Sequence, residues 1–173
     1  MTPSIRTKRG FTLLESILYI SIFSVMVLLL GRIGIDMLLS RAKTHALETV
    51  GTNTSFLMEQ IARDIERSAG ITMPVAGNTA TTLSLSMNDP DEDPVVFTIA
   101  SSTIYRTAGS GKAIRLSSSA VDIDALTFTN ISYPDTPGTV RTVMTIAAYN
   151  PEGETAYQVE ETSTTTANVR ITP

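Results

Sequence analysis

The sequence predicts an α+β fold, in which one long N-terminal helix precedes an antiparallel β-sheet domain. Three observations predict it: an apolar run that begins after Gly10, a helical spacing of apolar residues beyond that run, and short β-branched and aromatic runs after Gly70. These patterns divide the 173 residues into a basic segment at 1–10, a membrane-embedded helix at 11–34, an amphipathic continuation at 35–68 and a β-sheet domain at 69–173.

Composition excludes several classes of function. The formal net charge is -4, and from Ser68 onward acids outnumber bases, so the domain has no basic stripe for direct nucleic-acid binding. Cysteine is absent, which excludes disulfides and thiolate metal sites. His45 is the only histidine, so this chain alone provides no histidine pair for catalysis or metal binding. We therefore expect a non-enzymatic protein with no catalytic residues, metal or cofactor.

The helix is predicted to extend from Phe11 to Ser68. Its first part, Phe11 to Gly31, is long enough to cross the hydrocarbon layer of a membrane. Helical spacing then continues, with residues 63–67 expected as exposed last turns and Gly70 as the stop. Glycines weaken a helix, so bends are expected at Gly31, Gly34 and Gly51. The apolar positions that carry the helical spacing are Ile35, Leu39, Ala42, Ala46, Val50, Leu57, Ile61 and Ile65.

The sheet domain is predicted from alternation of apolar and polar residues, which places one face of a strand on a core and the other in solvent. Ser101-Ser102 is expected to form a tight connection between two strands, and the tyrosines (Tyr105, Tyr133, Tyr149 and Tyr157) are expected in the sheet. The predicted strands are Thr82–Met87, Val95–Ala100, Thr103–Thr107, Ala113–Leu116, Ala125–Ser132, Val140–Tyr149, Thr155–Glu160 and Ala167–Ile171.

Glu15 is the one acid in the apolar run, and it requires a physical explanation. A carboxylate in lipid is costly unless it is paired. The basic residues Arg6, Lys8 and Arg9 stand before Gly10, and such a basic segment keeps an N-terminus cytoplasmic while the following chain crosses the membrane. No small-residue cleavage site of the ordinary secretory type follows the run. The sequence therefore favours a helix that stays attached to the domain.

The stretch from Lys8 to Glu15 resembles the class III signal of type IV prepilins and pseudopilins. The matching residues are Lys8-Arg9-Gly10, then Phe11, then Thr12-Leu13-Leu14-Glu15. The resemblance implies that a prepilin peptidase cuts after Gly10 and methylates the new N-terminal residue, Phe11. It also implies that Glu15, at the fifth mature position, pairs with an N-terminal amine during filament assembly. Residues 1–10 would then be a prepilin leader peptide, and 11–34 would form a filament core.

Later segments are similar, in residue type and order, to J-type minor pseudopilins and related minor pilins. The implied partners are other pilin or pseudopilin subunits and the inner-membrane assembly platform. The implied location is the cytoplasmic membrane, with a single pass, an extracytoplasmic domain and a periplasmic or extracellular filament. A type IV pilus, a type II secretion system and a competence filament all remain open. The segments are Leu57–Arg67, Val95–Ile99, Ile104–Arg106, Ala125–Phe128 and Asn168–Ile171.

The sequence offers two other functions and two further groups of residues to weigh against this interpretation. The alternative is a single-pass membrane-anchored extracytoplasmic binding protein that never enters a filament, whereas an anchored hydrolase has little support because no catalytic set is evident. The acidic cluster at 88–93 offers Asp89, Asp91 and Asp93 as oxygen ligands for Ca²⁺, but a solvated turn is favoured because no EF-hand glycine or glutamate follows and prolines at 90 and 94 stiffen the loop. His45 is expected to be an exposed polar residue.

Overall fold

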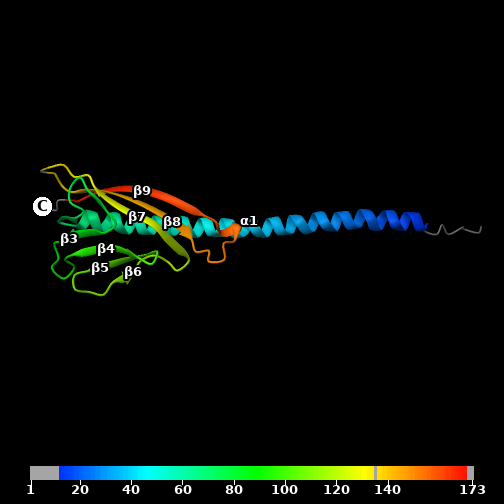
Figure 1. Cartoon of the computed structure of the whole chain (residues 1–173), viewed down its shortest axis with the longest axis horizontal. Coiled ribbons are helices and arrows are strands. Elements are labelled where there is room, and N and C mark those ends of the chain that lie inside the picture. Colours follow the sequence, from blue (N-terminus) through cyan, green and yellow to red (C-terminus); the bar gives the residue numbers. More distant parts are fainter. Residues whose placement is uncertain (1–11, 135, 171–173) are drawn as a thin grey trace, which may run out of the picture. The chain divides into compact units, whose positions relative to one another are not determined.

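The computed structural model describes residues 12–134 and 136–170, and it confirms the predicted α+β fold. The single long helix is α1 (Leu13–Arg67) (Figure 1). Contacts divide the chain into two compact units, Met1–Arg41 and Ala42–Pro173, and α1 contributes residues to both.

The first unit contains the N-terminal part of α1, and its described apolar side chains are exposed. Leu14, for example, is 80% exposed and Phe23 is 67% exposed. This part of α1 is long and apolar enough to span a membrane once. The helix is unbroken at Gly31 and Gly34, and also at Gly51 in the second unit, where bends were expected. The hydrogen bonds of a continuous helix offset the modest cost of each glycine.

The second half of α1 buries one face in the core of the domain. The predicted positions Ala46, Val50, Leu57, Ile61 and Ile65 are all buried, and Thr54, Met58 and Asp64 join them. The first two positions of the predicted stripe, Ile35 and Leu39, are exposed. The prediction that residues 63–67 form exposed turns was wrong for Asp64 and Ile65, because the buried face continues to the end of the helix.

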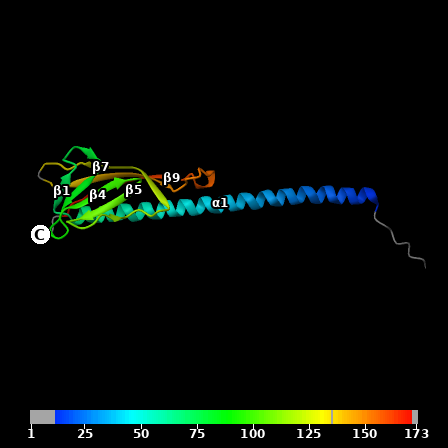
Figure 2. The ribbon, with the colours of Figure 1, turned by 60° about the horizontal axis from the view of Figure 1, so that its bottom comes forward.

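Two antiparallel sheets form the rest of the second unit. The first has the order β1-β3-β4-β5-β6 and the second has the order β2-β7-β8-β9 (Figures 1 and 2). The first sheet consists of β1 (Gly70–Met73), β3 (Leu83–Ser86), β4 (Val95–Ala100), β5 (Thr103–Ala108) and β6 (Ile114–Arg115). The second sheet consists of β2 (Thr79–Ala80), β7 (Val121–Asn130), β8 (Thr139–Ala148) and β9 (Glu160–Asn168).

A single core joins α1 to both sheets. Phe97 of β4, Phe128 of β7 and Met144 of β8 are fully buried in the same cluster as Leu57 and Ile61 of α1. The alternation of buried and partly exposed residues along β8 confirms that one face of this sheet packs on the core and the other faces outward. The amphipathic half of α1 therefore belongs to the domain.

The C-terminal strands differ from the prediction. The segment expected as a strand at Thr155–Glu160 contains instead a short 3-10 helix, η1 (Thr155–Tyr157), and the strand expected at Ala167–Ile171 is the end of the earlier strand β9. Only Tyr105 lies in a strand, whereas Tyr133, Tyr149 and Tyr157 lie outside the sheets. The short strands β1 and β2 were not expected.

The connection between β4 and β5 confirms the predicted tight turn. Ser101 and Ser102 have φ values of 47° and 55°. Positive φ at both central residues is the geometry that matches the twist of a two-residue β-hairpin. The register Ala100↔Thr103 follows directly from this turn.

Candidate functional site

The start of α1 shows why Glu15 is compatible with a helix end. Thr12 stands just before the helix, and its Oγ1 accepts a hydrogen bond from the backbone N–H of Glu15 at 3.3 Å. A Thr followed three residues later by Glu is the sequence of a capping box. A carboxylate in the first turn also interacts favourably with the helix dipole. The local structure thus supplies one role for Glu15 within its own helix.

The carboxylate of Glu15 is partly exposed, and among the residues described by the structure no lysine or arginine forms an ion pair with it. The other predicted site residues, Arg6, Lys8, Arg9, Gly10 and Phe11, lie outside the described residues. Cleavage after Gly10 and methylation of Phe11 therefore stay predictions.

Polar side chains inside the apolar run bond to their own helix. The hydroxyl of Ser21 donates to the carbonyl of Leu18 at 2.8 Å, and that of Ser24 donates to the carbonyl of Ile20 at 2.7 Å. Hydrocarbon offers no water to satisfy such groups, so these bonds lower the cost of placing the serines in a membrane.

The acidic cluster of the domain uses its side chains to shape its own turn. Asp93 Oδ1 accepts a hydrogen bond from the backbone N–H of Met87 at 2.8 Å, and Asp89 Oδ1 accepts one from Asp91 at 3.0 Å. Glu92 pairs with Arg67 at 3.0 Å. Within the ranges 12–134 and 136–170, no group of three His, Cys, Asp or Glu residues is arranged to hold a metal ion.

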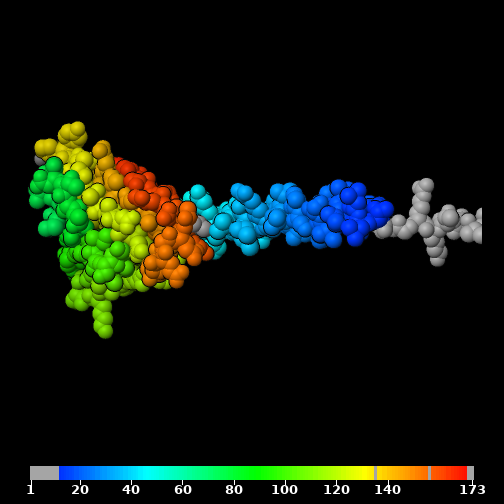
Figure 3. Space-filling model, turned by 45° about the vertical axis from the view of Figure 1, so that its right-hand side comes forward, coloured from blue at the N-terminus to red at the C-terminus, as the bar shows by residue number. Residues whose placement is uncertain are grey.

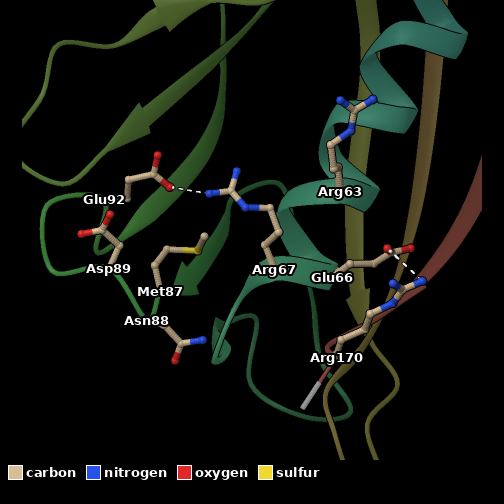
Figure 4. Close-up of a pocket in the computed structure, with 8 residues that line it drawn as sticks. All are labelled: Arg63, Glu66, Arg67, Met87, Asn88, Asp89, Glu92 and Arg170. Atoms are coloured by element: carbon tan, nitrogen blue, oxygen red, sulfur yellow. Dashed lines mark hydrogen bonds and ion pairs between the residues drawn. The ribbon is translucent and has the colours of Figure 1, made fainter. Parts of the chain in front are cut away.

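A cleft of about 480 Å³ separates the end of α1 from this acidic turn (Figure 4). Arg67 reaches across it to Glu92, while Glu66 pairs with Arg170 at 3.5 Å. Arg63 points away from both pairs and bonds instead to Glu59 at 2.6 Å. Each arginine of the cleft has an acidic partner, so the arrangement stabilises the junction of α1 with two loops and offers no unpaired cationic site for an anion.

A buried ion pair links α1 to the first sheet. Asp64 Oδ2 accepts a hydrogen bond from Arg106 Nε of β5 at 2.6 Å, and the two side chains are 0% and 14% exposed. Asp64 Oδ1 has no hydrogen-bond partner, and Arg67 Nη1 lies 3.8 Å from it. Sequence reasoning missed this pair. The available signal was the position of Asp64 three residues after Ile61, on the same face of the helix.

His45 is exposed, as predicted. Its Nδ1 lies 3.4 Å from the hydroxyl of Thr49. Both residues line a shallow hollow of about 320 Å³ together with Tyr149 and Tyr157. The hollow lies on the surface of the domain. The imidazole of His45 lies beside the hydroxyl of Thr49, one helical turn further along α1.

No family model matches this sequence, and neither curated proteins nor solved structures give a match.

Proposed function

We propose that this chain is a non-enzymatic structural subunit of a pilin-like filament, a minor pilin or pseudopilin. The observation that carries the proposal is the apolar part of α1, whose described side chains are exposed although they are as apolar as a membrane span. Such a surface requires lipid or other helices around it, because water makes its exposure costly. Assembly of subunits through their helices meets that requirement outside the membrane.

Glu15 supplies the carboxylate for the proposed ion pair between subunits. Cleavage after Gly10 would create an ammonium group on Phe11, four positions before Glu15. An acid and an amine about 4 Å apart attract each other by about 4 kcal/mol at an effective dielectric constant near 20. A growing filament would use the same attraction between the Glu15 of one subunit and the terminal amine of another. The resemblance around Gly10 supports this role, and the partial exposure of Glu15 leaves its carboxylate accessible.

The proposed setting follows from the same resemblance. The N-terminus would lie in the cytoplasm and the domain would lie outside the cytoplasmic membrane. Processing would require a prepilin peptidase, and assembly would require related subunits and an inner-membrane platform. Type IV pili, type II secretion and competence systems all use such subunits, and the chain fits each of them.

The experiment that tests the proposal is mass spectrometry of the mature protein from a host with an active prepilin peptidase. The expected N-terminus is Phe11 with a methyl group on its amine, and a host without the peptidase should retain residues 1–10. An intact leader in the competent host would contradict the proposal and favour the anchored binding protein.

Glu15→Ala provides a second test. We expect normal membrane insertion but at least about a tenfold loss of incorporation into filaments, since each 1.4 kcal/mol of lost pairing corresponds to a factor of ten. Quantitative immunoblotting of sheared filaments and of membranes measures both quantities. Asp36→Ala is the matched control, because Asp36 is an exposed acid further along the same helix. Equal incorporation of the two variants would exclude the pairing role of Glu15.

A further inference from the structure

The four sheet edges of the domain differ in how they are protected. An open strand edge presents unpaired backbone groups, and natural proteins shorten or distort such edges to prevent unwanted pairing. The edge strands β2 and β6 have two residues each, and β1 has four residues with a register shift between Ile71 and Met73. The strand β9 has nine residues and pairs with β8 without a shift.

The sequence and position of β9 leave its edge open. Residues 160–168 contain no proline, and their only charges are Glu160 and Glu161 at the start, so residues 162–168 carry none of the charged side chains or prolines that commonly guard an edge. Figures 1 and 3 both show β9 at the margin of the domain. Of the four edges, β9 is therefore the one that retains a long, regular row of backbone groups.

The register identifies which groups face outward. Ala148 N donates to Val159 O at 2.9 Å, and Val169 N donates to Gly138 O at 2.7 Å. Backbone groups alternate in direction along an antiparallel strand, so the odd-numbered residues between these positions point toward β8. The N–H and C=O groups of Thr162, Thr164 and Thr166 consequently point away from the sheet. In the described part of the chain, no further backbone hydrogen bond uses them.

The charged residues near the start of β9 indicate which kind of partner strand its free edge would bind. Glu160 and Glu161 are exposed at the start of β9, and neither forms an ion pair within the described ranges. Glu161 Oε2 lies 3.7 Å from the position of a Cβ on Gly51 of α1. Glu48, also exposed, stands about one helical turn before Gly51. A strand arriving here would meet carboxylates at the start of β9, and a lysine or arginine would pair with them.

Beyond the two glutamates, most side chains of β9 carry hydroxyl groups. The second sheet already joins its strands by threonine pairs, since Thr145 and Thr162 hydroxyls lie 3.0 Å apart and those of Thr79 and Thr129 lie 2.9 Å apart. Cross-strand threonine pairs stabilise antiparallel sheets. A threonine-rich partner strand would extend the same pattern along β9.

We propose that the free edge of β9 binds an extended, basic segment of a partner polypeptide as an additional strand of the second sheet. Main-chain hydrogen bonds to Thr162, Thr164 and Thr166 supply affinity, and Glu160 and Glu161, which point to opposite faces of the sheet, select two consecutive basic residues. A second copy of β9 fits less well. Paired antiparallel about Thr164, it would offer Asn168 rather than a base to Glu160, and paired in parallel it would oppose like charges.

The test measures binding of a short peptide to the full chain in detergent micelles. The probe alternates threonine and valine and ends in two lysines, and the control peptide ends in two glutamates. We expect binding of the lysine peptide alone, and severalfold weaker binding after the double change Glu160→Gln and Glu161→Gln. Equal binding of the two peptides, or no binding of the lysine peptide, would overturn the proposal.

Thr164 offers a matched pair of variants. Thr164→Pro removes an N–H that points outward, which an edge strand tolerates, whereas Thr164→Val keeps that N–H and loses the hydroxyl. We expect Thr164→Pro to weaken peptide binding by about tenfold, the scale of a lost main-chain hydrogen bond, and Thr164→Val to bind like the wild type. Unchanged binding by Thr164→Pro would exclude edge addition.

Hydrogen exchange of the wild-type protein provides a readout that needs no variant. The peptide should slow exchange at the amides of Thr162, Thr164 and Thr166, while the amides of Ser163 and Thr165, already bonded to β8, should change little. Self-association that Thr164→Pro abolishes in the absence of peptide would overturn the proposal in favour of a second copy.

Discussion

The carboxylate of Asp64 is buried in the core, where it forms an ion pair with Arg106. Burying two charges costs several kcal/mol per ion before their attraction is counted, so this pair is poor evidence for stability by itself. Its geometry instead links two elements, because Asp64 belongs to α1 and Arg106 belongs to β5. The pair therefore fixes where the end of the helix sits on the first sheet.

Removing one partner should be far more damaging than removing both. Arg106→Met would leave the buried carboxylate of Asp64 with Arg67, 3.8 Å from Oδ1, as its remaining cation, at a cost of up to about 3–5 kcal/mol. The double variant Asp64→Leu with Arg106→Met should recover most of that loss. Chemical unfolding of the full chain in micelles, arranged as a double-mutant cycle, measures the coupling. Additive effects of the two single changes would show that the pair does not act as a unit.

Gly109 has a backbone conformation that other residues rarely adopt, and it also approaches the acidic turn closely. Its φ is 53°, and a Cβ there would collide with the carbonyl oxygen of Asp91. Gly109→Ala should therefore destabilise the domain by about 3 kcal/mol, more than the cost of positive φ alone.

Gly77 is the matched control for Gly109. It has a φ of 82° with no atom within 4 Å of an added Cβ, so Gly77→Ala should cost only about 1–2 kcal/mol. Thermal unfolding of the two variants checks the difference. Similar losses would mean that the acidic turn yields to the added methyl group.

At the scale of elements, the two halves of α1 need different surroundings. The N-terminal half exposes apolar side chains that suit lipid, and the second half buries one face in the core of the domain. Val25→Lys, near the middle of the apolar run, should oppose membrane insertion by about 3 kcal/mol. Leu47→Lys is the control, because Leu47 is also half exposed, at 52%, but lies beyond the apolar run. The fraction retained in membranes after alkaline extraction measures both. Equal retention of the two variants would show that the apolar run is not the membrane anchor.

The sequence predicted best the strands that place one face on the core and the other outward, because their apolar and polar residues alternate. The strands β3, β4 and β8 alternate clearly, and these strands and β5 each lie within about two residues of their predicted bounds. β9 was misplaced because most of its side chains are exposed, so its threonines and glutamates carry little apolar alternation. β1 and β2 were missed because such short strands leave no period to recognise.

Of the candidate site residues, Glu15 was predicted from the sequence, whereas the buried pair of Asp64 and Arg106 was missed. Glu15 was recognisable because one acid in an apolar run departs from a local pattern. Asp64 resembled a surface residue, because a charge among charged neighbours gives no local sign of burial. Its partner Arg106 is distant in sequence, and only the packing of β5 against α1 brings the two together.

At the scale of the whole molecule, the boundary at Ala42 separates a unit whose described apolar side chains are exposed from a unit that has its own core. Every buried apolar residue of the described chain lies after this boundary, beginning with Ala46. A fragment of residues 42–173 should therefore fold without detergent and show mixed helix and strand by circular dichroism. Aggregation of the fragment, or a mostly helical spectrum, would contradict this division.

The position of α1 before every strand also has a consequence for how the protein is made. The ribosome completes the apolar face of Val50, Leu57 and Ile61 before it begins any strand that covers that face. Contacts between such distant segments form slowly, and an uncovered apolar face promotes aggregation in the interval. We therefore expect that shielding of this face, by a chaperone or by the membrane surface, reduces aggregation until β7 and β8 have paired.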